Sequence, residues 1–543
     1  MRTLGPNDLL AQFSARLPLL TGGPRDQPAR LQTMRDAIRW SYELLEPDEQ
    51  RLFRHLAVFV GGFTLDAAEE VGRNGVSPPS PSVLDRLTAL VDKSLVQREI
   101  GSEQTRYRML ETVREFGLET LVAAGEDEAV HESLAGWCLA FAARAEPELA
   151  GSEFALWVDR IRTDLGNIRA AQAWLFARDD AERALTLAGR LGWFWASGTY
   201  FQEGRALFDH LIAMPSAAEA PAPLARVLHA AGDVEQWLGN LDRAQDHFAQ
   251  ALTIFDAIDD GRGVVAMLRG LASVAIDRGD LDRAETLAER VLAMAPETGA
   301  AWEGASAQNL LGVVAYTRGD YASAVRFWEE AMRGWQTLGD TGHAASALAN
   351  LARAALAAGD PIRAAAVIRE VLADLTDAGG DLLVCDGFEV TAGVALATGD
   401  TPMATRLLAV SDAAQRRFGV QRWPAMQAKF EQMVATGRRG LGDAAFTVAW
   451  AEGENLPLEL ATAAALTMLG GVATSVQSGG RARGNEDALS QREQGVLRLL
   501  VDGLSDKEIA ATLGIARYTV SNHVSAIRDK LGVPSRAGAV ALA

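Results

Sequence analysis

Five hexapeptides recur at intervals of 40 residues in the middle of the chain: GNLDRA at 239–244, GDLDRA at 279–284, GDYASA at 319–324, GDPIRA at 359–364 and GDTPMA at 399–404. Each begins with glycine, continues with Asp or Asn, and ends with alanine. A period of this length is typical of stacked supersecondary units, which bury their apolar faces only against their neighbours. This part of the chain is therefore predicted to be a helical solenoid.

The chemistry of the hexapeptide predicts a turn between two antiparallel helices. Glycine accepts the positive φ at which a helix can end, and Asp or Asn can cap the next helix. Seven positions before each glycine stands a small residue that lets the helices approach closely: Gly232, Ala272, Gly312, Ala352 and Ala392. An alanine-rich bundle with glycines in phase by chance is the alternative, and five copies in register argue against it.

The pattern resembles the tetratricopeptide repeat, in which small residues flank a Gly-Asp turn at these offsets. The 40-residue period exceeds the usual length of about 34 residues, which predicts longer helices or longer connectors. Four tryptophans before the repeats are predicted to fill helical interfaces, because aromatic residues at helical spacing usually belong to a core. They are Trp157, Trp174, Trp193 and Trp195.

Composition limits the class of protein. At 543 residues the chain should hold three or four domains of about 150 residues each. Its two cysteines lie far apart and match no zinc or C-x-x-C spacing, so neither is a catalytic candidate and a reducing cytosol is expected. No signal peptide and no run of 18 apolar residues is visible, which predicts a cytoplasmic protein without a membrane partner.

The net charge is −19, which opposes nonspecific attraction to a nucleic acid backbone. Any contact with DNA must therefore be local.

The N-terminal part has a different pattern, with helical periodicity through Met34, Ile38, Tyr42 and Leu45. Further helices are predicted at 49–60, 64–72 and 83–92. Two short strands, Leu95 to Ile100 and Thr105 to Leu110, flank Gly101-Ser102 and give a hairpin signal before a helix from Glu111 to Val122. Helices followed by a β-wing predict a winged-helix domain.

Roughly the first 210 residues resemble the segment that follows the nucleotide-binding core in bacterial signal-transduction ATPases. The resemblance rests on LPLLTGGPRDQPARLQTMRDAIRWSYELL, FRHLAVFVGGFTLDAAEEV, LVDKSLV and RYRMLETVREFG. No G-x-x-x-x-G-K-[ST] loop is present to hold phosphates, so we expect no ATPase core, no cofactor and no enzymatic activity. Where relatives have a nucleotide-contacting Met-His-Asp motif, this chain has Met109-Leu110-Glu111, and leucine cannot donate that hydrogen bond. We therefore interpret the chain as a truncated or naturally shortened relative, whose winged helix is a spacer, an interaction surface or plain structural support.

The C-terminal segment carries three closely spaced helix signals. Ser490 with Glu493 and Ser505 with Glu508 form Ser-x-x-Glu capping boxes ahead of two short helices, which Gly503 and Gly514 are predicted to end. A third helix is predicted from about Arg517 to Leu531. Its apolar residues should face a core that also contains Ile509 and Leu513. These residues are Val520, Val524, Ile527 and Leu531.

A short helix, a turn and a longer helix with a polar face is how a recognition helix is presented to the major groove of DNA. Residues 509–543 hold four basic residues and one acid, a net charge of +3. A phosphate-facing surface is therefore expected here. No cluster of His, Cys, Asp or Glu has metal-ligand spacing, so no metal site is predicted.

The segment LSQREQGVLRLLVDGLSDKEIAATLGIARYTVSNHVSAIRDKLGVPSR resembles the LuxR-type helix-turn-helix. The resemblance implies that the third helix reads double-stranded DNA and that a fourth helix, after Ser535, supports a homodimer. Together with the polar face of the third helix, it predicts the following DNA-binding residues: Lys507, Arg517, Tyr518, Thr519, Ser521, Asn522, His523, Ser525, Arg528, Lys530 and Arg536. The sequence departs from the family at Ala516, where a serine cap is usual, and at Ser521 and Ser525, where basic residues are common. These departures predict modest affinity.

The fold class expected for the whole chain is mainly α. We predict a helical and winged-helix-like region at 1–130, a helical region leading into the repeats at 131–230, tetratricopeptide-like repeats at 231–468, a flexible linker at 469–487, and the LuxR-type domain at 488–543. The predicted function is transcription control, in which the repeats receive a protein or small-molecule signal and the last domain binds promoter DNA. The alternatives are an interaction scaffold that does not bind DNA and a nucleotide-driven switch.

Overall fold

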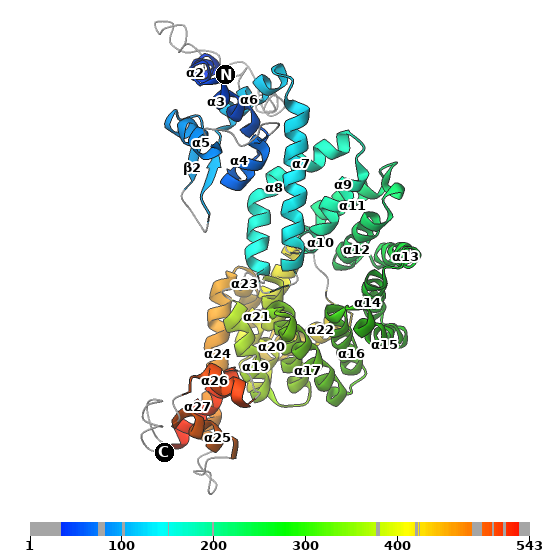
Figure 1. Ribbon diagram of the computed structural model, residues 1–543. Coiled ribbons are helices and arrows are strands. Elements are labelled where there is room, and N and C mark those ends of the chain that lie inside the picture. Colours follow the sequence, from blue (N-terminus) through cyan, green and yellow to red (C-terminus); the bar gives the residue numbers. More distant parts are fainter. Residues whose placement is uncertain are drawn as a thin grey trace. The chain divides into compact units, whose positions relative to one another are not determined.

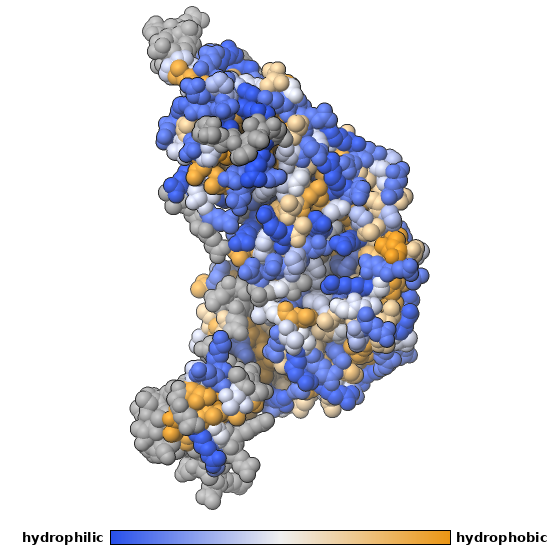
Figure 2. Space-filling view, in the orientation of Figure 1, coloured by the Kyte–Doolittle hydropathy of each residue, from blue (hydrophilic) through white to orange (hydrophobic). Residues whose placement is uncertain are grey.

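The computed structural model describes residues 34–73, 82–99, 104–149, 151, 153–197, 200–375, 381–418, 422, 424–479, 491–501, 504–513 and 517–531 (Figure 1). The chain divides into two compact units, residues 1–472 and residues 473–543. Helices dominate the described residues, so the predicted mainly α class is confirmed. None of the described helices is long and apolar enough to cross a membrane. Hydrophilic residues cover most of the visible face of the larger unit, with apolar residues in scattered patches (Figure 2).

The N-terminal region is the predicted winged helix. Its helices are α2 (Met34–Glu43), α3 (Pro47–Leu56), α4 (Leu65–Gly72), α5 (Val83–Asp92) and α6 (Glu111–Ala123). The strands β2 (Gln97–Glu99) and β3 (Arg106–Arg108) pair antiparallel, which confirms the hairpin, although both are shorter than expected and Gly101-Ser102 lies outside the described residues. A two-residue strand, β1 (Phe63–Thr64), pairs with the other side of β3 and is too short for a sequence pattern to reveal.

Two long helices follow, α7 (Asp127–Glu148) and α8 (Phe154–Ala177), and a buried polar network attaches the winged helix to α8. The Arg106 guanidinium of β3 donates two hydrogen bonds, of 3.0 and 2.9 Å, to the Asp164 carboxylate of α8. Asn167, one turn further along α8, donates to the Gly62 carbonyl at 2.9 Å and accepts from the Val60 amide at 2.6 Å. The winged helix and α8 therefore share a buried interface.

Three shorter helices and a 3-10 turn follow: α9 (Ala181–Arg190), α10 (Gly192–Trp195), α11 (Phe201–Ile212) and η3 (Ala217–Glu219). Trp157 and Trp195 are buried, as the sequence predicts, whereas Trp174 and Trp193 are only partly buried. The Trp193 ring instead meets Trp302 and His343 of the repeats at centroid distances of 5.0 and 5.6 Å. Trp193 therefore joins the region before the repeats to residues more than a hundred positions later in the chain.

Five helix pairs form the repeats. They are α12 (Pro221–Trp237) with α13 (Leu241–Ala257), α14 (Gly261–Asp277) with α15 (Leu281–Thr298), α16 (Ala301–Thr317) with α17 (Tyr321–Leu338), α18 (Thr341–Ala357) with α19 (Pro361–Leu375), and α20 (Asp381–Thr398) with α21 (Thr401–Phe418). Consecutive helices contact one another along the series, as in a solenoid (Figure 1). These long helices account for the 40-residue period.

The turn inside each pair has the predicted backbone. All five hexapeptide glycines have positive φ, between 76° and 91°. The aspartates at 280, 320, 360 and 400 each accept a hydrogen bond from the backbone amide three residues later, so they cap the second helix. Asn240 does not cap its helix, contrary to the prediction, because its side-chain amide donates to the Glu235 carboxylate at 2.6 Å.

The two helices of a pair are matched in size at one position. Gly232 of α12 faces the Phe248 ring of α13, where an added Cβ would lie 2.5 Å from a ring carbon. Gly312 of α16 faces Trp328 of α17 in the same way, at 2.4 Å from the indole nitrogen. In the other three pairs the first helix has alanine at this position, and the residue 16 positions later is not aromatic: Ala288, Ile368 and Leu408. Glycine thus stands opposite the two aromatic rings, and alanine stands at this position where the later residue is not aromatic.

Three further helices close the larger unit: α22 (Pro424–Leu441), α23 (Asp443–Glu454) and α24 (Leu458–Gly479). The last of these runs through residues 469–479, which were predicted to begin a flexible linker. The helix continues because Leu469 and Val472 are buried in the same core as Ala461 and Ala465, at helical spacing. The rest of the predicted linker, residues 480–487, lies outside the described residues.

We expect Gly312→Ala to destabilise the chain by about 1–3 kcal/mol, the usual cost of overpacking a closed core, because the new methyl group meets the Trp328 ring. Urea unfolding followed by circular dichroism measures the loss. In a Trp328→Leu background the same substitution should cost less, since the equivalent positions of the fifth repeat hold Ala392 and Leu408. Gly136→Ala on α7 is the control, because its Cβ would enter open space. Equal stability of Gly312→Ala and the unchanged chain would contradict the matched packing.

Candidate nucleic-acid interface

The C-terminal unit contains three described helices, α25 (Gln491–Val501), α26 (Asp506–Leu513) and α27 (Arg517–Leu531). The third helix begins at the predicted residue. The three helices enclose a small apolar core, to which each of them contributes: Val496, Leu500, Ile509, Ala510, Val520, Val524 and Ile527. Only residues 514–516 separate α26 from α27, so the arrangement of helix, short turn and helix is the one expected from the sequence.

The start of α26 is held by the predicted capping box. The Glu508 amide donates to the Ser505 hydroxyl at 3.4 Å, and the Ser505 amide donates back to the Glu508 carboxylate at 2.7 Å. The Ser505 hydroxyl also donates to this carboxylate, and these hydrogen bonds lower the pKa of Glu508. The other predicted box begins at Ser490, outside the described residues.

The apolar face of α27 is largely as predicted. Val520, Val524 and Ile527 are buried against Ile509 of α26. Leu513 is wrongly predicted to be a core residue, because 39% of it is exposed at the end of α26. Its spacing of four residues from Ile509 and three from Ala510 puts it on the same face of α26, but it is the last residue of that helix. The side chain of Leu531 and the predicted fourth helix after Ser535 lie outside the described residues.

The structure describes the side chains of five predicted DNA-binding residues. Lys507 on α26 and Ser525 on α27 are exposed, and Thr519, His523 and Arg528 on α27 are partly buried. All five therefore reach the surface of this unit. Five more belong to α27, and their side chains lie outside the described part: Arg517, Tyr518, Ser521, Asn522 and Lys530. Arg536 lies beyond the described residues.

The chain contains a second helix-turn-helix, in the winged helix, and its exposed residues differ in charge. On α5 the outward-facing residues are Leu84, Asp85, Thr88 and Asp92, and this face carries no basic residue. Asp85 also caps the helix with Ser82. Two carboxylates on the helix that would enter a groove repel phosphate, whereas residues 509–543 are net positive. Charge therefore favours the C-terminal unit as the nucleic-acid interface.

One cluster outside this unit has the composition of a metal site, although the sequence predicts none. Ligand atoms of Asp209, Glu235 and His247 lie within 4.8 Å of one another. Arg243 forms ion pairs with both carboxylates, at 3.0 Å from Glu235, and Arg205 lies 3.5 Å from Glu235. Guanidinium groups thus already neutralise the acids, and we assign no ion to this cluster. Its residues come from α11, α12 and α13, which no local sequence spacing could have brought together.

Family models match the same three regions that the sequence and the structure distinguish. Residues 487–543 match the model of bacterial regulatory proteins of the luxR family. Tetratricopeptide repeat models match residues 223–297 and 305–377, and a winged helix-turn-helix model matches residues 45–122. The resemblances stated from the sequence to LuxR-type domains and tetratricopeptide repeats are thereby confirmed.

Similar proteins are named as regulators. The chain is 27% identical to a Mycobacterium tuberculosis protein named as an HTH-type transcriptional regulator, over 99% of this chain and 77% of that protein. A nitrate/nitrite response regulator protein homolog of Haemophilus influenzae is 48% identical over 10% of this chain and 27% of its own length. A signal transduction ATPase with a tetratricopeptide repeat sensor from Pyrococcus horikoshii matches in structure with a TM-score of 0.43 and 15% identity, over 83% of this chain and 68% of that one.

These matches support a DNA-binding regulator that carries a helix-turn-helix. The chain combines a C-terminal LuxR-type domain with tetratricopeptide repeats and an N-terminal winged helix-turn-helix.

We expect Ile527→Ala to loosen the C-terminal unit, because Ile527 is fully buried and such truncations cost about 2–5 kcal/mol. Hydrogen exchange of the full chain, read on peptides of α26 and α27, should show faster exchange. Tryptophan fluorescence would not report the change, since the last of the chain's tryptophans is Trp450. Ser525→Ala, on the exposed face of α27, should leave exchange unchanged. Equal exchange in the two variants would show that α27 does not pack as described.

Proposed function

We propose that the protein controls transcription by inserting α27 into the major groove of promoter DNA. The observation that carries the proposal is the two-sided character of α27. Val520, Val524 and Ile527 are committed to the core, and Ser525 points to solvent from the same helix. A helix held in this way, three residues after a capped shorter helix, is the arrangement by which helix-turn-helix proteins present side chains to base edges.

The predicted residues divide into two groups by chemistry. Lys507, Arg528, Lys530 and Arg536 carry positive charge and would contact phosphates, which position the domain without reading sequence. Asn522 can donate and accept at an adenine edge, so it would contribute specificity. The local excess of positive charge supports this division, because the whole chain, at −19, would otherwise be repelled by DNA.

In this proposal the chain acts by binding rather than by catalysis. The repeats receive a protein or small-molecule signal, and the last domain passes it to a promoter, with a homodimer formed through the segment after Ser535. The regulators among its relatives support this reading. The winged helix, whose sheet is attached to α8 through Asp164 and Asn167, would be a structural or interaction module.

Two substitutions on α27 should behave differently if the proposal is right. Lys530→Ala should weaken binding to cognate and random duplexes alike and lower the salt slope by about one unit, since one phosphate contact is lost. Asn522→Ala should weaken the cognate duplex alone, by roughly 1–3 kcal/mol. The cognate duplex comes from selection of bound genomic fragments, and affinities are measured with the full chain at two salt concentrations.

Arg262→Ala is the matched control, because it removes one exposed positive charge from the repeats. It should change neither the affinity nor the salt slope. If Asn522→Ala weakened both duplexes equally, Asn522 would not be the residue that reads bases. If the full chain bound neither duplex at low salt, the chain would act as an interaction scaffold instead.

A further inference from the structure

A cavity of about 420 Å³ lies between the first helices of the last three repeats and α22. Its volume falls within the usual range of small-molecule sites, about 300–1,000 Å³. Residues of α16, α18 and α20 form one side, and α22 forms the other. The cavity belongs entirely to the larger unit and is separate from the helix-turn-helix.

The repeats build this cavity from equivalent positions. Tyr316, Leu356 and Leu396 each stand three residues before a turn glycine, and all three line the cavity. Arg353 and Gly393 are likewise separated by one repeat length. Three successive repeats thus contribute in the same way. Aligning the repeats shows these positions, but the sequence gives no sign that α22 would cover them.

The walls are mainly apolar, and one glycine keeps the space open. Leu356 and Leu396 lie on the repeat side, and Met426 and Met433 lie on α22. A Cβ on Gly393 would come within 2.3 Å of the Leu356 side chain, so a larger residue here would push Leu356 aside. Methionine side chains adapt to different apolar ligands because they are flexible and polarizable.

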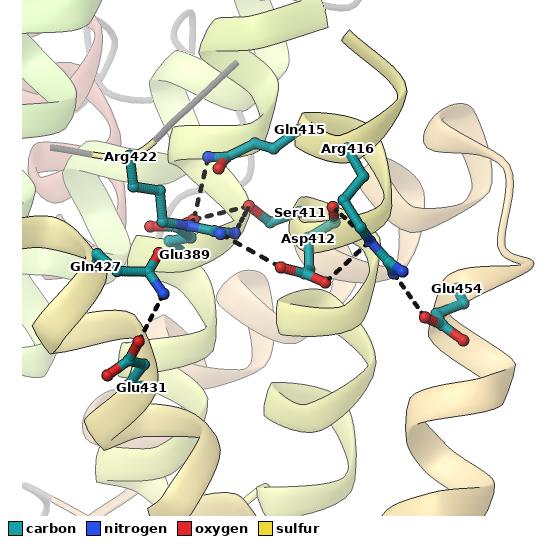
Figure 3. A network of polar contacts seen from close by, with 9 residues as sticks. All are labelled: Glu389, Ser411, Asp412, Gln415, Arg416, Arg422, Gln427, Glu431 and Glu454. Carbon is teal, nitrogen blue, oxygen red and sulfur yellow. Dashed lines mark hydrogen bonds and ion pairs between the residues drawn. The ribbon is translucent and has the colours of Figure 1, made fainter. Parts of the chain in front are cut away.

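The carboxylate in the wall, Glu389, already has hydrogen-bond and ion-pair partners (Figure 3). It accepts a hydrogen bond of 2.8 Å from Ser411 and one of 2.7 Å from Arg422. Arg422 also contacts Asp412 at 3.3 Å and lies 3.6 Å from the centre of the Phe430 ring. Burial raises the pKa of Glu389, and Arg422 acts in the opposite direction. Glu389 is therefore poorly placed to bind a cationic ligand.

The remaining charges of the cavity wall are positive. Arg353 is mostly buried and lies 3.5 Å from Asp386, outside the cavity wall. Lys429 is exposed at the cavity, and no carboxylate among the described residues forms an ion pair with it. A cation at the edge of an apolar space complements a molecule with an anionic head and an apolar body.

We propose that this cavity binds a small anionic amphiphile, a carboxylate on an apolar chain or ring, with its head at Lys429 and its body among Leu356, Leu396, Met426 and Met433. The proposal rests on the proposed signal-receiving function of the repeats and names the chemistry of the signal. The ligand binds without covalent change.

Calorimetric titration of the full chain with decanoate, 1-decanol and decyltrimethylammonium tests the proposal. We expect decanoate to bind at least about tenfold more tightly than either of the other probes. One charge-assisted contact is enough to produce a difference of this size. Lys429→Gln should remove that preference, and Lys429→Arg should retain most of it. Ala397→Phe, which fills the cavity, should abolish binding of all three, with circular dichroism confirming that this variant is folded. Arg262→Gln is the control and should bind decanoate like the unchanged chain.

Two results would overturn the proposal. One is equal affinity for the three probes, and the other is unchanged decanoate binding in both Lys429→Gln and Ala397→Phe. DNA binding with and without decanoate separates this inference from the proposed function. If decanoate binds through Lys429 but never changes the affinity for DNA, the cavity is assigned correctly and its role in signalling is wrong. If DNA is not bound at all while decanoate is, only the proposed function fails.

Discussion

The larger unit depends on one backbone conformation, the positive φ at the glycine that ends the first helix of each repeat. Without it the chain could not reverse within so few residues, and the following Asp could not cap the second helix. Because the reversal recurs every 40 residues, equivalent helices of successive repeats have equivalent packing partners. The cavity beside α22 depends on this regularity, since Tyr316, Leu356 and Leu396 come together only if three repeats stay in register.

Much of the fold could be predicted because its signals are local. Turn glycines, capping boxes and helical spacing all act within one or two turns of chain, so the repeats, the β-hairpin and α27 could be identified from the sequence. Leu513 was misplaced because its spacing fits the apolar face of α26, whereas its position as the last residue of the helix leaves it exposed. The first half of the expected linker was predicted wrongly because the prediction rested on its glycine and serine content. Leu469 and Val472 are buried in the core there, and this burial extends α24.

What could not be predicted depends on residues distant in sequence. Trp193 meets Trp302 and His343 only because the chain returns to them after several helices. Glu389 of α20 forms a buried pair with Arg422, which lies between α21 and α22, and no spacing rule indicates this contact. The assignment of the DNA interface, by contrast, depends more on the sequence than on the structure. There the family pattern and the charge of the segment carry most of the assignment, and the structure adds which face of α27 is committed to the core.

The matched positions in the repeats have a consequence for how such an array can change its length. Consider an array that changed its length by exchange between similar segments. An exchange at the turn glycine would join the first helix of one repeat to the second helix of another. Joining α14 to α17, for example, would set Ala272 against the position of Trp328, where glycine is needed. Exchange between repeats, at the turns near Asp259, Gly299 and Gly339, keeps each pair intact. The self-contained packing unit is therefore the helix pair, and its boundary lies 20 residues away from the turn glycine inside it.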